Sequence, residues 1–422
     1  MELKPGYLCP LGYKQTEVGL IPEEWNPTSL KGKIGIAHGF AFASEHFASH
    51  GKYRLTTPGH FNEAGGFRDI GEKQKYYDGP VPSDYVLRPG DLIVAMTEQA
   101  DGLLGSAAVI PKVHGYLHNQ RLGRVKSLSS EIELAYLFYV FNSPSYRAKV
   151  RETAAGTKVK HTSPGKLLEI SVRLPPIPEQ RAIAGVLSDV DGLIGALDQL
   201  IAKKRDLKQA TMQQLLTGKT RLPGFSGEWE VKRIGEFTDC TAGGTPSTAV
   251  PAYWGGSIRW MSSGELNLKI VNEVEGRITE LGLQNSSTKI VPVNCVLIGL
   301  AGQGKTRGTV AVNHVELCTN QSIAAIFPIT SFESTYLYYN LDFRYDELRP
   351  LSAGDGGRGG LNLKIIRSIL VPFPKLEEQT AIAEVLSDMD AELAALEQRR
   401  DKTRDLKQGM MQELLTGRTR LI

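Results

Sequence analysis

A stretch of 44 residues occurs twice in this chain, and this repeat limits the possible folds more than any other feature. Residues 179–222 and 378–421 are identical at 28 of 44 positions, with a constant offset of 199 residues. Each copy follows a proline-rich segment and ends in Leu-Thr-Gly, which are start and stop signals of a helix. The repeat therefore predicts two similar long helices.

The apolar residues inside each copy recur in steps of four and three, the spacing of a coiled-coil seam. A helix of about 39 residues would be about 58 Å long. Since neither apolar stripe can remain in water, we expect the helices to pair with one another, antiparallel and with approximate two-fold symmetry. The seam residues are Ile183, Leu187, Val190, Ile194, Leu197 and Ile201 in the first copy and Ile382, Leu386, Met389, Leu393 and Leu396 in the second.

A polar run is repeated as well, although a seam requires only its apolar positions. A repeated exposed surface suggests a partner that is bound twice. The alternative is a recent duplication that has not yet drifted, but the segments between the helices share that history and have diverged strongly. The candidate partner-docking residues are Arg205, Asp206, Lys208, Gln209, Arg404, Asp405, Lys407 and Gln408.

The segments between the repeats align only weakly. Glu24-Trp25 matches Glu228-Trp229, and residues 54–62 match residues 259–267. Asn119-Gln120 matches Asn320-Gln321, and we expect a structural role for both pairs. Short β-like runs at 86–96, 106–111, 291–300 and 308–312, with helical stretches such as 132–141, predict α+β domains with twisted or barrel-like sheets. The expected division is a first domain at 1–174, a helix at 175–222, a second domain at 223–373 and a helix at 374–422.

The composition is that of a globular protein, with 422 residues, 41% hydrophobic and 23% charged. The longest apolar runs fall short of the roughly 20 residues of a membrane-spanning helix, and no leader pattern opens the chain, so we expect a cytoplasmic protein. The four cysteines form no CxxC pair and are expected to be buried free thiols.

The net charge of +3 does not by itself indicate nucleic-acid binding, but the distribution of charge along the chain is more informative. Residues 143–222 contain 14 Lys and Arg against 7 Asp and Glu, which indicates either a phosphate-facing surface or a solvated helix face. Two similar domains on antiparallel helices would present one face twice in opposite directions, as the strands of duplex DNA do. Because the domains differ in sequence, this arrangement predicts a split and asymmetric DNA target.

Several segments together resemble the specificity subunit of type I restriction-modification systems. They are YKQTEVGLIPEEW at 13–25, the duplicated helices, GGTPS at 243–247 and the two Asn-Gln pairs, and the resemblance covers essentially the whole chain. It implies two target-recognition domains that each read half of a bipartite DNA sequence. It also implies that the helices set the spacing and dock two modification (methyltransferase) subunits, which restriction subunits join. By this resemblance the chain has no catalytic activity, and S-adenosylmethionine, ATP and magnesium belong to the partners.

The residues agree with a non-enzymatic, cofactor-free subunit. We find no NPPY or DPPY tetrapeptide of adenine methyltransferases, no glycine-rich S-adenosylmethionine loop, no paired helicase motifs and no metal-ligand spacing among the eight histidines. Residues 299–306 do fit the P-loop pattern GxxxxGK[ST]. However, a P-loop continues into a helix, whereas glycine and β-branched residues follow here, so we expect a basic loop near DNA phosphate instead.

Base reading requires side chains that form paired hydrogen bonds in the major groove, on segments that reach it. The base-contact candidates are Arg54, Thr57, His60, Asn62, Arg259, Ser262, Glu265 and Asn267, which could instead pair with carboxylates or cap helices. The phosphate candidates are Lys158, Lys160, His161, Lys166, Lys305, Arg307, Arg358 and Lys364, which could instead be plain solvated charges.

Two other functions remain open at this point. A scaffold would recruit two copies of a partner through its helices and leave DNA alone. A nucleotide-dependent enzyme would bind nucleotide through Lys305 and lose it on Lys305→Ala. Salt-dependent binding of duplex DNA, rising sharply for one split sequence, distinguishes the specificity subunit from both.

Overall fold

The chain folds into two compact units, each built from sheets, short helices and parts of two long helices. The first unit holds residues 1–196 and 399–422, and the second holds residues 197–398. The mixed helix and sheet content confirms the predicted α+β class. The computed structural model describes residues 9–98, 102–156, 159–302, 306–351 and 360–422.

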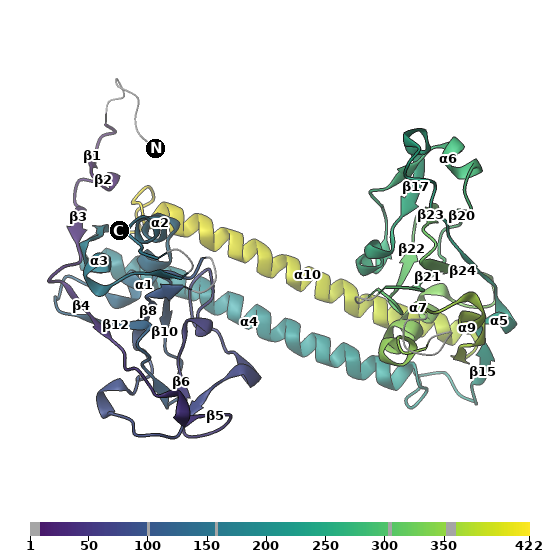
Figure 1. Cartoon of the computed structure of the whole chain (residues 1–422), viewed down its shortest axis with the longest axis horizontal. Coiled ribbons are helices and arrows are strands. Elements are labelled where there is room, and N and C mark those ends of the chain that lie inside the picture. The colour runs from purple at the N-terminus through teal and green to yellow at the C-terminus, as the bar shows by residue number, and fades with distance from the viewer. Residues whose placement is uncertain (1–8, 99–101, 157–158, 303–305, 352–359) are drawn as a thin grey trace. The chain divides into compact units, whose positions relative to one another are not determined.

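The two copies of the repeat form α4 (Ile177–Leu215) and α10 (Leu376–Leu414), each an uninterrupted helix of 39 residues (Figure 1). The division between the units falls inside both helices, so each unit contains the beginning of one and the end of the other. Within each unit the two stretches run antiparallel. The ion pairs that show this direction are Glu179 to Arg420 and Asp191 to Lys407 in the first unit, and Lys204 to Glu392 and Arg221 to Glu378 in the second.

The principal sheets of the two units have the same strand order and the same antiparallel pairing. The first unit has the order β10-β8-β12-β4, and the second has β22-β21-β24-β16 with β18 added in parallel beside β22. The strands are β4 (Ile34–His38), β8 (Leu92–Ala95), β10 (Ala107–Val109) and β12 (Leu122–Ser127), and β16 (Cys240–Ala242), β18 (Ile270–Val271), β21 (Val296–Gly299), β22 (Val310–Asn313) and β24 (Ile323–Ile326).

Each unit has a second sheet that contains one parallel pair, β6 with β11 in the first unit and β17 with β23 in the second. The orders are β11-β6-β7-β5 and β19-β17-β23-β20. The strands are β5 (Phe47–Ala48), β6 (Tyr53–Leu55), β7 (Tyr76–Tyr77) and β11 (Tyr116–Leu117), and β17 (Trp254–Met261), β19 (Arg277–Ile278), β20 (Ile290–Val291) and β23 (Leu317–Thr319).

Two-stranded sheets complete the topology. A strand just before each long helix pairs with a strand near the start of the same unit: β14 with β3, and β25 with β15. The remaining pairs are β1 with β2 and β9 with β13. The strands are β1 (Tyr13–Thr16), β2 (Gly19–Pro22), β3 (Asn26–Ser29), β9 (Thr97–Glu98), β13 (Lys160–His161), β14 (Ser171–Leu174), β15 (Glu230–Arg233) and β25 (Leu370–Phe373).

The short helices follow the same duplicated plan. α1 and α7 occupy equivalent places: the Tyr136 hydroxyl of α1 donates to the Arg173 carbonyl at 2.9 Å, and the Tyr336 hydroxyl of α7 donates to the Pro372 carbonyl at 2.9 Å. The α-helices are α1 (Leu134–Asn142), α2 (Pro144–Glu152), α3 (Pro164–Glu169), α5 (Ile234–Phe237), α6 (Glu280–Gln284), α7 (Ser334–Phe343), α8 (Tyr345–Leu348) and α9 (Leu363–Ser368). The 3-10 helices are η1 (Ser44–His46), η2 (Pro58–His60), η3 (Gly71–Lys73), η4 (Ser83–Tyr85), η5 (Pro251–Tyr253) and η6 (Ser263–Leu268).

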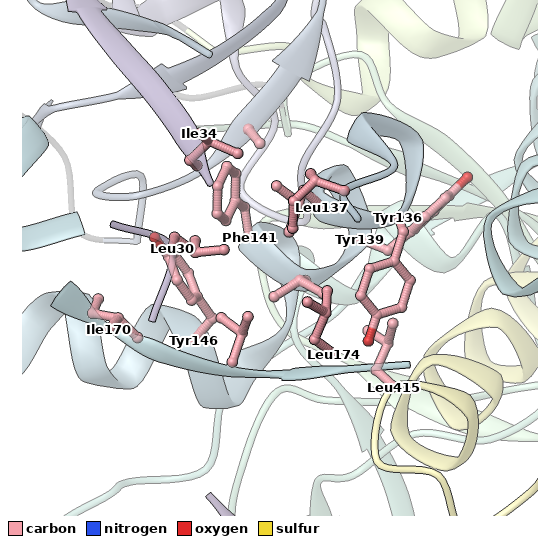
Figure 2. Close-up of a cluster of buried hydrophobic side chains, with 14 of the residues drawn as sticks. Leu30, Ile34, Tyr136, Leu137, Tyr139, Phe141, Tyr146, Ile170, Leu174 and Leu415 are labelled. Atoms are coloured by element: carbon pink, nitrogen blue, oxygen red, sulfur yellow. The ribbon is translucent and has the colours of Figure 1, made fainter. Parts of the chain in front are cut away.

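The end of one long helix completes the core of each unit. Leu414 and Leu415, from the end of α10, belong to the apolar cluster of the first unit, and Figure 2 shows Leu415 in that cluster. Met212 and Leu215 of α4 belong to the corresponding cluster of the second unit. Each fully buried leucine contributes roughly 1.5–3 kcal/mol, so neither core is complete without residues from the far end of a long helix.

A tryptophan, a glutamate and an arginine lock each of these helix ends. In the first unit, Trp25 Nε1 donates to Glu179 Oε2 at 2.9 Å and Arg420 Nη2 donates to the same atom at 2.9 Å. In the second unit, Trp229 Nε1 donates to Glu378 Oε2 at 3.0 Å, and Arg221 pairs with the same carboxylate. Both glutamates are nearly fully buried. The repeated Glu-Trp and Thr-Arg-Leu segments therefore belong to two copies of one structural lock.

The glycine that follows each helix is required at this lock. Gly218 and Gly417 have φ values of +68° and +74°, in the left-handed region that favours glycine. A Cβ on Gly417 would lie 2.5 Å from Pro22 Cδ, and one on Gly218 would lie 3.2 Å from the Trp229 ring. The Leu-Thr-Gly stop signal thus both ends the helix and lets the chain pass closely over the tryptophan segment.

The predicted seam is only partly a contact between helices. Its first residues, Ile183 and Leu187 in α4 and Ile382 and Leu386 in α10, are buried in the apolar clusters of the globular parts. Farther along, Leu197, Ile201 and Leu393 are buried, whereas Val190, Ile194, Met389 and Leu396 remain half-buried. The heptad pattern therefore reflects burial against the other long helix, which the sequence predicted, and burial in the apolar clusters of the globular parts, which it did not predict.

Several local predictions from the sequence agree with the structure, but over fewer residues than predicted. The β-like run at 86–96 yields only β8, because Gly90 turns the chain at a φ of +89° just before it. Cys240, Cys295 and Cys318 are buried free thiols as expected, but Cys9 is exposed. In the part of the chain that the structure describes, no helix is long and apolar enough to cross a membrane.

Candidate nucleic-acid interface

His60, a base-contact candidate of the first unit, is committed to a turn. It is 1% exposed; its Nδ1 accepts from the Thr57 backbone N–H at 3.1 Å, and its Nε2 lies 2.9 Å from Gln74 Oε1. Burial lowers the pKa of His60, which favours the neutral ring that accepts at Nδ1. The prediction that His60 reads a base is wrong in this structure, because the ring caps η2 and has no surface left for DNA.

The other candidates of the first unit are more accessible. Arg54 lies near the rings of Tyr76 and Tyr116, at 5.9 and 5.7 Å from their centroids, and donates to the His114 carbonyl at 3.1 Å. Asn62 is exposed and Thr57 is half-buried. Arg54 therefore has a structural role whether or not it meets DNA, and the base contacts of Thr57 and Asn62 remain predictions.

Two candidates of the second unit form a cap like that of His60. Glu265 Oε2 accepts from the Ser262 backbone N–H at 2.8 Å and from the Ser262 hydroxyl at 2.9 Å, while Oε1 accepts from the Glu275 N–H at 3.1 Å. The weak alignment of these segments thus reflects one capping arrangement, built with histidine in one unit and glutamate in the other. Both carboxylate oxygens of Glu265 are therefore used in hydrogen bonds within the unit, and the prediction that Glu265 reads a base is corrected. Ser262 belongs to the same cap.

Arg259 pairs with a surface carboxylate instead of standing free. Its Nε and Nη2 donate to the two oxygens of Glu273 at 3.0 and 3.2 Å, and this pairing lowers the pKa of Glu273 to about 2. Asn267 is exposed and donates to the Gly264 carbonyl at 2.9 Å. Of the second set, Asn267 is the residue most open to solvent, and its base contact stays a prediction.

The two Asn-Gln pairs each form the same turn. Asn119 Oδ1 accepts from the Arg121 N–H at 3.0 Å, and Asn320 Oδ1 accepts from the Ser322 N–H at 3.0 Å. The asparagines therefore have the structural role that we predicted. The side chains of Gln120 and Gln321 are both exposed, and Gln321 Oε1 accepts a hydrogen bond from the Thr245 hydroxyl.

A hollow of about 600 Å³ lies beside the turn of the first unit. Its apolar lining includes Phe42, Phe47 and Leu55, and its polar lining includes Gln120 with four cations. Those cations are Arg68, Lys73, Lys75 and Arg121, and the lining has no carboxylate among the described residues. Sequence reasoning missed these residues, because they come from four separate segments that only the folded second sheet brings together.

The predicted phosphate contacts have mixed positions. His161 and Lys364 are exposed, Lys160 and Arg307 are half-buried, and the Lys166 amine donates to the Thr153 carbonyl at 2.5 Å. Lys158, Lys305 and Arg358 lie outside the described residues. The phosphate contacts of the accessible members stay predictions.

The P-loop match at 299–306 does not lead into a helix. β21 and β22 flank it as neighbouring antiparallel strands, with Ile298 opposite Val310. A phosphate-binding P-loop presents the N-terminus of a helix to the nucleotide, so the hairpin agrees with the sequence argument against nucleotide binding. The described residues also contain no group of three or more His, Cys, Asp or Glu side chains that could hold a metal ion.

Comparison with known proteins identifies the family. The family described as "Type I restriction modification DNA specificity domain" matches residues 22–203 and again residues 226–403. The chain belongs to this family of DNA specificity subunits. Since the two matches cover most of the chain, the resemblance inferred from the sequence is confirmed.

Relatives with the same description match over most of their length. The MjaX specificity subunit of a type I restriction enzyme of Methanocaldococcus jannaschii, whose own assignment is provisional, is 24% identical, with 97% of each chain covered. The EcoBI specificity subunit of Escherichia coli is 22% identical, with 89% of this chain and 81% of that protein covered. A crystal structure of the S subunit from M. genitalium has a TM-score of 0.61 at 15% identity, covering 92% of this chain and 96% of that one. A second structure, from a study of assembly and conformational transition of the type I system, has a TM-score of 0.55 at 18% identity, covering 94% and 99%.

In this specificity subunit the repeated polar run is not uniformly exposed. Lys208 pairs with Asp390 and lies 5.2 Å from the centroid of the Tyr339 ring, whose hydroxyl donates to the same aspartate at 2.7 Å. Lys407 pairs with Asp191 at 2.6 Å and lies 5.6 Å from the centroid of the Tyr139 ring. The lysine side chains are only 17% and 18% exposed. The prediction of a fully exposed run is therefore wrong at both lysines, whose repetition has a structural reason.

The rest of the run faces solvent. Arg205 pairs with Glu397 while its side chain stays 60% exposed, and Arg404 lies 3.6 Å from Asp401 and is 48% exposed. Asp206, Gln209, Asp405 and Gln408 are exposed. So are Leu207 and Leu406 at 50% and 60%, which lie inside the run and were not among the sequence candidates.

Proposed function

We propose that this specificity subunit reads a split, asymmetric DNA sequence, with one target-recognition domain for each half-site, and performs no catalysis itself. The observation that supports this most strongly is the duplicated scaffold that carries unlike surface residues. Two domains that share a scaffold but differ in their surface residues suit two half-sites of different sequence. The domains would be residues 1–174 and 223–373, joined by spacer helices at 175–222 and 374–422.

We further propose that the exposed part of the repeated run docks two modification subunits. Asp206 and Asp405 with the neighbouring leucines give two similar surfaces of mixed charge and apolar character, which suits a protein partner. S-adenosylmethionine would then bind to the modification subunits, and ATP and magnesium would bind to any restriction subunits that join them. In this arrangement the helices hold the half-sites at a fixed distance.

The test of DNA reading is to express the chain with its modification subunits and map methylated adenines across a host genome by single-molecule sequencing. We expect one bipartite motif with two unlike half-sites and a fixed gap. A well-formed complex without new methylation would contradict the proposal and favour a scaffold. Removal of one heptad from α4 should change the gap, and an unchanged gap would exclude the spacer role.

The test of docking is the double variant Asp206→Lys with Asp405→Lys. We expect it to fold normally and to lose co-purification with the modification subunit, because each surface loses one negative charge and gains one positive charge. The matched control is Gln213→Lys with Gln412→Lys, exposed positions with the same 199-residue offset on the same helices. Equal co-purification of both variants would overturn the docking assignment.

A further inference from the structure

The Asn-Gln turn has the same geometry in both units although its surroundings differ in sequence. The Gly39 N–H donates to the Leu122 carbonyl at 3.3 Å, and the Gly243 N–H donates to the Ile323 carbonyl at 3.2 Å. A Cβ on either glycine would lie 2.1 Å from a backbone oxygen, that of Asn119 or that of Thr319. Each turn is therefore packed against a backbone segment that admits only glycine.

This packing holds the glutamine outward. The asparagine before it is used in the turn, and the chain behind it is held at backbone-contact distance, so the exposed side chain at the tip is that of Gln120 or Gln321. The residue that follows differs: Arg121 in the first unit and Ser322 in the second. A rigid frame with a constant glutamine and a variable neighbour is a suitable device for reading related but unequal sequences.

The hollow beside the first turn has the charge that a nucleic acid requires. Lys73 and Arg121 are exposed, and no ion pair is found for either of them within the described residues. Lys75 lies 5.7 Å from the centroid of the Phe47 ring, and Arg68 is held by two hydrogen bonds from its guanidinium to the Gly59 carbonyl. With an apolar floor and no carboxylate in the described lining, the hollow favours an anionic ligand such as a phosphate backbone over a neutral or basic protein surface.

We infer that the Asn-Gln turn is the base-reading tip of each target-recognition domain, with Gln120 and Arg121 reading the first half-site and Gln321 the second, and that Lys73 and Lys75 hold the DNA backbone beside the first tip. The inference rests on the proposed function. Glutamine makes paired hydrogen bonds to adenine, and arginine makes them to guanine. The Thr245 hydroxyl donates to Gln321 Oε1 and so orients its amide.

The deciding experiment compares Gln120→Ala with Gln321→Ala in the full complex with modification subunits. Binding is measured on the mapped target and on duplexes changed at one base pair at a time. We expect Gln120→Ala to lose about tenfold of the preference at one base pair of one half-site only, and Gln321→Ala to do the same in the other half-site. Arg121→Ser should remove a preference for guanine next to the position that Gln120 reads.

A charge test addresses the hollow separately. Lys73→Ala with Lys75→Ala should weaken binding to all duplexes and lower the slope of log affinity against log salt by about 2. The matched control, Lys31→Ala with Lys126→Ala, removes two exposed lysines of the same unit that do not line the hollow. An equal loss in both double variants would overturn the assignment of the hollow.

The outcomes separate this inference from the proposed function. If the native complex reads a bipartite target and both glutamine variants keep every base preference, the tip assignment is wrong and the proposed function stands. If a glutamine variant instead fails to bind the modification subunit, the turn is a protein contact and the inference is also wrong. If the native complex shows no sequence preference at all, the proposed function itself has failed.

Discussion

The first unit presents Gln120 and Arg121 at the turn where the second presents Gln321 and Ser322, yet both turns are supported by the same glycine contact and the same asparagine bond. Behind the turns, the strand orders of the principal sheets agree, and the Trp-Glu-Arg locks are built alike. The units therefore share the frame of the turn and the way the long helices are held, and they differ at the residue next to the glutamine. Specificity can change in such a molecule without any change in its frame.

The largest test of this equivalence removes the buried carboxylate of each lock. Glu179→Ala should lower the free energy of unfolding of the first unit by about 3 kcal/mol, because it leaves the Trp25 N–H without an acceptor and leaves Arg420 with only the exposed Glu24 carboxylate. Glu378→Ala should do the same to the second unit. Hydrogen exchange with mass spectrometry assigns the loss to one unit or the other. Unequal losses would show that the locks are similar in geometry but not in energy.

Acid should distinguish the two units. Burial lowers the pKa of His118 to about 4, below its ordinary value of 6.5, so folding holds this ring neutral. The unfolded chain takes up the proton first as the pH falls, so the unfolding free energy of the first unit should decrease between pH 6.5 and 4, by about 2 kcal/mol at pH 5. His60, whose pKa burial also lowers, adds to this loss, so His118→Gln should reduce the dependence without abolishing it. The second unit has one histidine, His314, and its side chain is exposed. Protonation of a buried histidine should therefore not change the hydrogen-exchange protection of the second unit between pH 6.5 and 4.

The smallest expected difference lies between the two aligned arginines. Arg54→Ala should cost the first unit about 1 kcal/mol, because the guanidinium lies near two tyrosine rings. Arg259→Ala should leave stability unchanged within error, because its partner Glu273 is a surface carboxylate. In that variant the pKa of Glu273 should return toward its ordinary value, which NMR titration of the side chain would detect. An unchanged pKa would mean that the ion pair does not form in solution.

The parts of the fold that could be predicted are those with a local pattern. The heptad spacing and the Leu-Thr-Gly signal predicted α4 and α10, and the duplication predicted that the two units would share a scaffold. The roles of Lys208 and Lys407 could not be predicted, because their partners Asp390 and Asp191 lie on the other helix. His60 and Glu265 were predicted as base contacts because a cap and a reading residue require the same chemistry. The structure distinguishes His60 by its burial and Glu265 by the hydrogen bonds that its carboxylate accepts. The hollow was missed because its cations come from segments without a common motif.

The lock between Glu179 and Arg420 joins residues that are 241 positions apart in the chain. At a synthesis rate of about 5–20 residues per second, the first unit must wait roughly 10–50 seconds for the segment that closes its core. The second unit receives its closing segment from α4, which is made before the unit itself, so it can close as soon as α10 begins. During synthesis the second unit should therefore finish folding ahead of the first, with the buried site for Leu414 and Leu415 left open as a target for chaperones until then.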